Sequence, residues 1–310
     1  MNIIGPDELI FGVEDIDVCA TFLTDYGLTD VGNGQFEAMD GTCITLKAID
    51  DPLLPPALPS GSTLRRTVWG VADAATLDGI EIELGRDRQV VRAADGSLST
   101  VDDLGFAIGF QLTRRRAFQA DAEYVNSPGH ADGRPMNEIG SNEQADARPV
   151  TLSHVVYFVP DAERMTRFYI ERLKFIETDR FLKMGPFLRP RGSADHHALF
   201  MIETPEHMKG LEHFAFHVQG PTALMLAGSR FRQKGYESFW GPGRHNFGSN
   251  WFWYFKSPLG AAIEYDADMD RLDEAWEPRI SPPHPDNSQI FLLRNIDKWA
   301  PGGGPPPSRD

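Results

Sequence analysis

The sequence predicts an α+β fold made of two related halves. In each half, an apolar β-rich run is followed closely by an Asp residue and a helical pattern, and several short strand patterns come next. This order occurs twice, on either side of a polar stretch near the middle of the chain, which indicates an internal duplication. The 310 residues are enough for two domains that each bury a core without disulfide or zinc support.

The first half begins with a strand pattern at 9–13. Asp15 or Asp17 then supplies the side-chain oxygen that typically begins a helix. The other elements expected in this half are strands at 36–38, 43–46, 67–71 and 106–112, with a helix after Asp73.

The second half begins after residues 126–148, which contain Gly and Pro, have no apolar periodicity and are therefore expected to be a linker. A strand at 152–159 precedes Asp161, which is placed to cap a helix. The other expected elements are strands at 175–181, 197–202, 213–218, 251–255 and 261–265, with a helix at 222–234. We thus expect an N-terminal domain at 1–125, a C-terminal domain at 149–270 and a tail at 271–310.

The tail is rich in Pro and Gly, and its end is expected to be disordered. Trp276 and residues 290–293 are the apolar groups that could hold its first part against a domain surface.

Composition excludes several functions. The formal net charge of −15 should repel nucleic acids and anionic membrane surfaces. Two separated cysteines, Cys19 and Cys43, suggest neither a disulfide framework nor a thiolate metal site. No secretion signal and no apolar run of about 18 residues occurs, so a cytoplasmic location is expected.

Three side chains in the second half are candidate metal ligands. His154, His213 and Glu264 each lie in an apolar strand pattern, where a charged Glu264 would be costly to bury unless a cation were bound. Two imidazoles and one carboxylate on one face of a metal ion leave three adjacent positions open, which suits a diol and O2 on iron(II). Spacing alone is weak support, because any single strand histidine is more often a structural, hydrogen-bonded residue.

The wider sequence context is more specific. The segments 152–159, 195–200, 211–218, 243–245 and 254–265, in that order, resemble the type I extradiol dioxygenases of the vicinal oxygen chelate superfamily. The resemblance implies two domains, each a pair of βαβββ modules forming a cupped mixed sheet, with the metal held only in the C-terminal domain. It also implies Fe(II), or alternatively Mn(II), bound by His154, His213 and Glu264. The implied reaction is O2-dependent ring cleavage of a small aromatic diol by a homo-oligomer.

The same resemblance implies the catalytic residues. It places the histidine on the oxygen side at the His196-His197 pair, a second histidine at His245 and the site tyrosine at Tyr254. The doubled histidine departs from the family pattern and leaves two registers open. We prefer His197, because it directly precedes the strand pattern at 198–201 as the family histidine does.

The internal repeat allows a check on the number of metal sites. Aligning the halves puts Glu8, Arg66 and Gly109 opposite His154, His213 and Glu264. This set cannot form a comparable site, so one metal site per chain is expected. His217 should lie about 13 Å from His213 along the strand, which excludes a shared ion.

Other functions remain open for the same residues. A 4-hydroxyphenylpyruvate dioxygenase-like or glyoxalase-like enzyme would need a similar metal triad but would not explain His197, His245 and Tyr254 together. A metal-free binding module would need no ligand trio. The aromatic cluster Phe239-Trp240 and Trp251-Phe252-Trp253-Tyr254 is typical of core and sheet packing. Part of this cluster, together with Phe181, Met184 and Phe187, is also a candidate lining for an aromatic substrate pocket.

Overall fold

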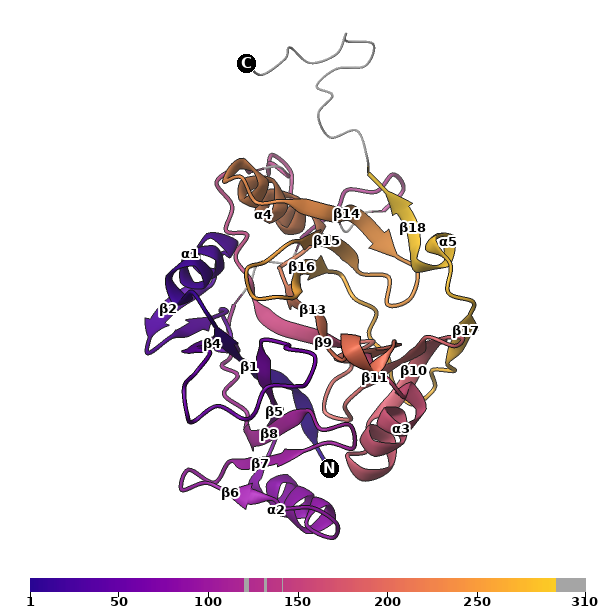
Figure 1. Ribbon diagram of the computed structural model, residues 1–310. Coiled ribbons are helices and arrows are strands. Elements are labelled where there is room, and N and C mark those ends of the chain that lie inside the picture. Colours follow the sequence, from indigo (N-terminus) through magenta and orange to yellow (C-terminus); the bar gives the residue numbers. More distant parts are fainter. Residues whose placement is uncertain (120–122, 131–132, 141, 294–310) are drawn as a thin grey trace.

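Two β-sheets form the framework of the protein (Figure 1). The computed structural model describes residues 1–119, 123–130, 133–140 and 142–293. One sheet has eight strands, all from the first half, and the other has ten, all from the second half and the tail. Each sheet contains two βαβββ units, so the predicted α+β class and module order are confirmed.

The N-terminal sheet has the strand order β2-β3-β4-β1-β5-β8-β7-β6. Its first unit comprises β1 (Ile3–Val13), α1 (Ile16–Tyr26), β2 (Thr29–Gly32), β3 (Gln35–Glu37) and β4 (Cys43–Ala48). Its second unit comprises β5 (Leu64–Val71), α2 (Ala74–Leu84), β6 (Val91–Arg92), β7 (Leu98–Val101) and β8 (Ala107–Leu112). Asp15 and Asp73 cap the two helices through their carboxylates.

The second sheet has the order β17-β10-β11-β12-β9-β13-β16-β15-β14-β18. Its first unit comprises β9 (Thr151–Val159), α3 (Ala162–Arg167), η1 (Phe168–Arg172), β10 (Ile176–Phe181), β11 (Gly185–Arg189) and β12 (Leu199–Glu203). After η2 (Glu206–Met208), the second unit comprises β13 (Gly210–His217), α4 (Pro221–Gln233), β14 (Ser238–His245), β15 (Trp251–Phe255) and β16 (Ala262–Ala267). Asp161 caps α3, as predicted.

The tail adds the outermost strand on each side of this sheet. β17 (Arg279–Ser281) pairs with β10, while α5 (Pro285–Ser288) leads into β18 (Gln289–Leu292), which pairs with β14. Trp276 also holds the tail, since its indole nitrogen donates to the Thr178 carbonyl at 2.8 Å. The Pro- and Gly-rich end that we expected to be disordered lies outside the described residues.

Strands β11 and β14 were absent from the sequence prediction. β11 begins with Gly185-Pro186, and β14 contains Gly241, Pro242 and Gly243, residues that usually indicate turns. The pairing of β14 with β15 shifts register between Trp240 and Gly243, so the strand accommodates Gly241 and Pro242 as an irregularity.

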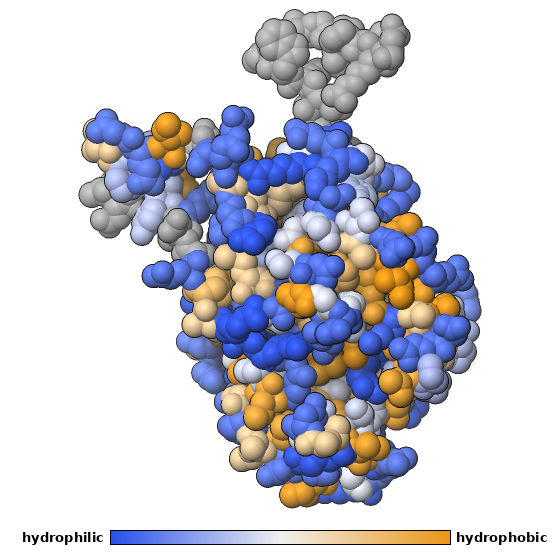
Figure 2. All heavy atoms as spheres, turned by 90° about the vertical axis from the view of Figure 1, so that its left-hand side faces the viewer, coloured by the Kyte–Doolittle hydropathy of each residue, from blue (hydrophilic) through white to orange (hydrophobic). Residues whose placement is uncertain are grey.

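One hydrophobic core joins the two halves. The largest cluster of buried side chains includes residues from both sheets and from α1, α3 and α4. Tyr26 of α1 stacks on Tyr265 of β16 at 4.0 Å between ring centroids, and Phe11 lies 5.5 Å from Phe214. The surface seen in Figure 2 carries many hydrophilic residues with smaller apolar groups between them. No helix of the described residues is long and apolar enough to span a membrane.

Candidate metal centre

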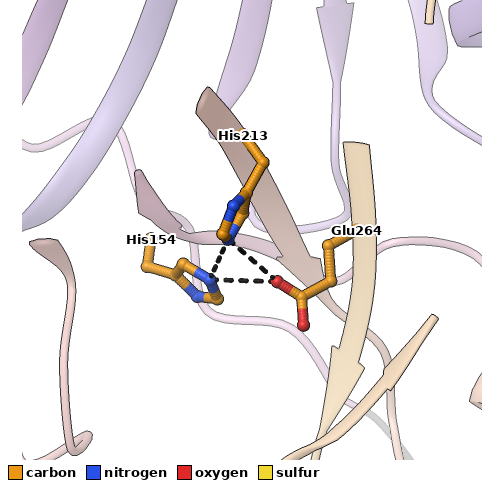
Figure 3. Close-up of side chains that lie close together, drawn as sticks. All are labelled: His154, His213 and Glu264. Atoms are coloured by element: carbon orange, nitrogen blue, oxygen red, sulfur yellow. Dashed lines mark hydrogen bonds and ion pairs between the residues drawn. The ribbon is translucent and has the colours of Figure 1, made fainter. Parts of the chain in front are cut away.

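Three neighbouring strands bring the predicted ligands together. Ala215 of β13 pairs with His154 of β9 on one side and with Glu264 of β16 on the other. His213 precedes Ala215 by two residues, and side chains two apart on a strand point to the same face of a sheet. All three side chains therefore lie on one face and converge (Figure 3).

The ligand atoms surround a common point. Oε2 of Glu264 lies 3.1 Å from Nε2 of His154 and 3.3 Å from Nε2 of His213, and the two Nε2 atoms are 3.3 Å apart. Ligands at right angles around a metal, each bonded at about 2.1 Å, would be separated by about 3 Å. Within the part of the chain that the structure describes, this is the only group of three such side chains with ligand atoms so close.

Neighbouring polar groups orient both imidazoles. Nδ1 of His154 lies 2.8 Å from the Ser153 hydroxyl and 3.5 Å from a carboxylate oxygen of Asp266. Nδ1 of His213 is hydrogen-bonded to the Glu212 carboxylate. With Nδ1 engaged, each ring presents Nε2 to the common point, as histidine ligands of metals do.

The electrostatics without a metal show a strongly coupled charge cluster. Burial opposes the charged form of His213, but the Glu212 and Glu264 carboxylates outweigh it and raise its pKa to about 10. Burial likewise opposes the charged form of Glu264, yet the neighbouring imidazoles hold its pKa well below the usual value. The site therefore favours a carboxylate with positive charge beside it.

Glu264 provides a test of whether a metal ion fits. The residue is fully buried, and among the described residues neither of its carboxylate oxygens has a hydrogen-bond partner of good geometry. A buried, ionised carboxylate without hydrogen bonds is very costly. A divalent cation bound between Oε2 and the two Nε2 atoms would remove that cost, so the residues fit a metal ion.

A pocket of about 240 Å³ opens onto this cluster. His197, His245 and Tyr254 line it together with His154 and His213. His197 packs against His154, with 4.5 Å between ring centroids. Burial holds the pKa of His197 well below its ordinary value, so its imidazole is neutral near pH 7.

His196 does not line this pocket. Its Nε2 lies 2.7 Å from the Asp179 carboxylate, and its Nδ1 lies 3.0 Å from Nδ1 of His197. Asp179 is in turn bound by the Arg279 guanidinium. Of the two registers that the sequence left open, only the one with His197 puts an imidazole into the pocket, and His196 lies behind it.

His245 and Tyr254 face each other on the opposite side of the pocket. Nδ1 of His245 must carry a proton, because it lies 2.9 Å from the Ser288 carbonyl oxygen, which can only accept. In the neutral ring, Nε2 is then an acceptor, and it lies 3.2 Å from the Tyr254 hydroxyl. Burial raises the pKa of Tyr254 well above 10, so the hydroxyl stays protonated.

Several polar residues of the site were not singled out from the sequence. Glu212, Asp266 and Ser153 are adjacent to the ligands or two positions away, a spacing that could have identified Asp266 as sharing the face of Glu264. Asn250 gives no such signal, since it lies in a loop. It is fully buried and lines the pocket, and neither amide atom has a hydrogen-bond partner among the described residues.

The N-terminal sheet repeats the strand geometry without the ligands. Glu8 of β1 pairs with Val68 of β5, which pairs with Gly109 of β8, just as His154 and Glu264 flank Ala215. Arg66 precedes Val68 by two residues, in the position of His213. The alignment of the two halves from sequence thus agrees with the pairing register. His217, expected to be remote from the ion, is bound to Asp266 at 2.7 Å.

The fold and the buried cluster define a protein of paired βαβββ modules with one candidate mononuclear metal site. Residues 151–265 match the family model described as the Glyoxalase/Bleomycin resistance protein/Dioxygenase superfamily. The match covers the strands that carry His154 and His213 and reaches Glu264 and Tyr265 of β16.

One curated protein is also similar in sequence over part of the chain. Over 155 residues the chain is 32% identical to Metapyrocatechase 2 of Cupriavidus necator, and the match covers 48% of each protein. The chain thus spans about half the length of this curated relative.

Solved structures extend the likeness of fold to nearly the whole chain. The Mn(II)-bound glyoxalase from Novosphingobium aromaticivorans has a TM-score of 0.73 at 20% identity, covering 94% of this chain and 91% of that one. The 2,2',3-trihydroxybiphenyl 1,2-dioxygenase from Sphingomonas wittichii strain RW1 has a TM-score of 0.68 at 18% identity, covering 94% and 98%.

Proposed function

We propose that the protein is an Fe(II)-dependent extradiol dioxygenase, which opens an aromatic ring next to two adjacent hydroxyls and inserts both atoms of O2. The observation that carries this proposal is the buried cluster of His154, His213 and Glu264 at the base of a pocket that also presents His197, His245 and Tyr254. The partial match to Metapyrocatechase 2 supports it.

His245 and Tyr254 are proposed to handle the substrate protons. The metal ion, when bound, would supply the Lewis acidity that lowers the pKa of the diol and brings it together with O2. The hydrogen bond from Nδ1 to Ser288 leaves Nε2 of the neutral His245 ring as the acceptor, and His245 lines the pocket, so Nε2 can accept a proton from a hydroxyl of the diol. The Tyr254 hydroxyl remains protonated and can donate a hydrogen bond to the resulting oxyanion.

His197 is proposed to act on the oxygen side. It packs against His154 rather than against His245 and Tyr254, so it borders the metal position from a different direction. There its neutral ring can hydrogen-bond negative charge that develops on oxygen, and it can take up a proton released by the diol and return that proton during ring opening. His196, held by Asp179, is proposed to orient His197.

The proposal is tested by adding Fe(II) to the purified protein without air and then supplying 3-methylcatechol or 2,3-dihydroxybiphenyl with O2. We expect a yellow ring-fission product with one O2 consumed per diol. Parallel samples loaded with Mn(II) decide the metal, since this ligand set accepts both ions. A protein that takes up metal but consumes no O2 with any diol contradicts the proposal.

The requirement for metal, for O2 and for a particular substrate separates the alternative functions. A glyoxalase-like isomerase would require the metal but no O2, whereas a metal-free binding module would retain its ligand affinity after removal of the metal. A 4-hydroxyphenylpyruvate dioxygenase-like enzyme would consume O2 with a 2-oxo acid instead of a diol.

We also propose a cytoplasmic, homo-oligomeric enzyme. Both cysteines are free and buried, which suits a reducing compartment. Light scattering of the purified protein would determine its oligomeric state.

A further inference from the structure

One wall of the pocket is a second hydrophobic cluster, separate from the main core. Its buried members are Val156, Phe181, Phe187, Phe200 and Phe247, with Met184 and Ile202 packed against them. All seven line the pocket. Since these side chains do not join the main core, the surface available to them is the pocket itself.

The strand register fixes this wall directly beside the metal position. His213 pairs with Val156 across β13 and β9, Val156 pairs with Phe200 of β12, and Phe200 pairs with Phe187 of β11. Paired residues share a face, so one row of side chains runs from a ligand into the wall. Phe187 and Phe200 stack with their ring centroids 4.0 Å apart.

The opposite wall is aromatic as well. Phe239 and Trp240 of β14 line it, and Trp240 stacks on Tyr254 at 4.8 Å. The indole nitrogen of Trp240 is engaged by the Gln289 side chain of β18 at 2.8 Å, so its ring faces are what the pocket can use. A substrate ring bound at the metal would thus extend between two apolar surfaces.

The pocket offers no cationic side chain to an anionic substituent. Among the described residues that line it there is no Lys or Arg, and Glu212 adds a carboxylate. The Arg279 guanidinium lies 5.0 Å from the Phe247 ring centroid, but it is bound to Asp179. A carboxylate entering this space would lose its hydration without an ion pair.

We propose that the substrate is a catechol with an uncharged apolar substituent, and that the pocket rejects catechols whose side chain carries a carboxylate. This inference rests on the proposed function. Burial of each substituent CH2 between the walls contributes to binding, by about fourfold per group, whereas an unpaired carboxylate is penalised.

The test compares two substrates of similar size on the Fe(II)-loaded protein, 4-ethylcatechol and 3,4-dihydroxyphenylacetate. We expect kcat/KM to be at least about 100-fold higher for the alkyl compound. Unsubstituted catechol serves as the reference and should fall between them. Because this comparison uses the natural chain, it does not depend on the folding of a variant.

A positive charge introduced into the pocket sharpens the test. Met184 lies in the turn between β10 and β11 and contacts the apolar wall, so Met184→Arg would bring a cation to the pocket. We expect this change to reduce the preference for the alkyl compound at least about tenfold. Leu182→Arg is the matched control, because Leu182 is in the same turn but exposed and outside the pocket. It should change the preference less than about twofold.

The two levels of failure can be told apart. Equal or faster cleavage of 3,4-dihydroxyphenylacetate would overturn the substrate class while leaving the dioxygenase function intact. Absence of O2 consumption with all three diols would overturn the proposed function and this inference with it.

Discussion

In each of the two candidate histidine ligands, one ring nitrogen is held by the protein and the other is left for a metal ion. Ser153 and Asp266 engage Nδ1 of His154, and Glu212 engages Nδ1 of His213, so both Nε2 atoms remain for an ion. The lone carboxylate of Glu264 completes the set without a hydrogen bond of its own among the described residues. Each ligand is therefore positioned before any metal arrives, which is the condition for tight binding.

Removal of one ligand should abolish metal uptake. We expect His154→Ala, treated with Fe(II) and desalted, to hold much less than one iron per chain by elemental analysis, since two ligands cannot replace three. His207→Ala is the control, because His207 is an exposed histidine of η2. Stoichiometric iron in His154→Ala would contradict the ligand assignment.

Replacement of His197 should affect turnover more than binding. Its proposed role concerns charge that appears only after O2 binds. We expect His197→Gln to lower kcat by about 100-fold or more, as for loss of a general acid or base, with little change in substrate affinity measured without O2. Equal losses in both quantities would argue that His197 merely shapes the pocket.

Replacement of Asn250 should lower activity without lowering stability. Its buried amide has no partner among the described residues, so Asn250→Ala removes a desolvation cost of about 1–3 kcal/mol. We expect the variant to unfold at the same or a higher denaturant concentration, while kcat/KM falls about tenfold through loss of a substrate contact.

The control for Asn250 is Thr178→Ala. Thr178 is equally buried, but its hydroxyl donates to the Phe187 carbonyl at 3.1 Å. This change should cost about 1–2 kcal/mol of unfolding free energy. A destabilisation of the same size in Asn250→Ala would mean that the amide is structural.

Among the elements, the alternation of side chains along strands made the metal ligands predictable. His154, His213 and Glu264 stand in apolar runs whose strand character is evident in the sequence, and neighbouring pairing brings them together. The doubled histidine was ambiguous because His196 and His197 precede β12, where no strand alternation assigns their directions. A long-range backbone contact fixes the direction of His196, because its amide donates to the Asp270 carbonyl at the end of the C-terminal domain at 2.8 Å.

Long-range contacts made by the tail could not be predicted from the sequence either. The Ser288 carbonyl that fixes the tautomer of His245 comes from α5, and Gln289 that holds Trp240 comes from β18. Both depend on pairing across many residues, for which local periodicity carries no signal. Asn250 escaped notice for the related reason that loops have no regular facing pattern.

The connection between β7 and β8 should make stability depend on pH. Asp102 in this loop is buried, and one of its carboxylate oxygens accepts hydrogen bonds from the Leu104 and Phe106 amides. Burial nevertheless raises the pKa of Asp102 to about 7, against an ordinary value of 3.8. Between these two values the folded protein retains a proton that the unfolded chain has released, so folding stability falls as pH rises from about 4 to 7.

We therefore expect Asp102→Asn to be as stable as the natural protein near pH 4 and more stable near pH 8, by about 4 kcal/mol for a shift of about three pKa units. Urea unfolding at both pH values measures this difference. Asp103→Asn is the control, since Asp103 pairs with Arg88 at a partly exposed position. If Asp102→Asn and Asp103→Asn show the same pH profile, Asp102 is not the group responsible.

At the scale of the whole molecule, the N-terminal half, which lacks the ligands, supports β16, the strand that carries Glu264. The Tyr26 hydroxyl of α1 donates to the backbone carbonyl of Glu264 at 2.6 Å, and the Tyr265 hydroxyl donates to the Tyr26 carbonyl at 2.7 Å. These reciprocal bonds lie in the core shared by both sheets. The first half, with Glu8, Arg66 and Gly109 in place of the ligands, thus acts as a structural support for β16.

Loss of this support should weaken folding and the metal site together. Tyr26→Phe keeps the stacked ring but removes the buried hydroxyl, so we expect unfolding free energy to fall by about 1–2 kcal/mol and Fe(II) affinity to fall several-fold as the Glu264 backbone loses its tether. The control is Tyr236→Phe, which removes a half-buried hydroxyl bound to Asp25 at the same junction of the halves but not to β16. It should leave Fe(II) affinity unchanged, and an equal loss of affinity in both variants would show that the junction as a whole, rather than the Tyr26 tether, sets the geometry of Glu264.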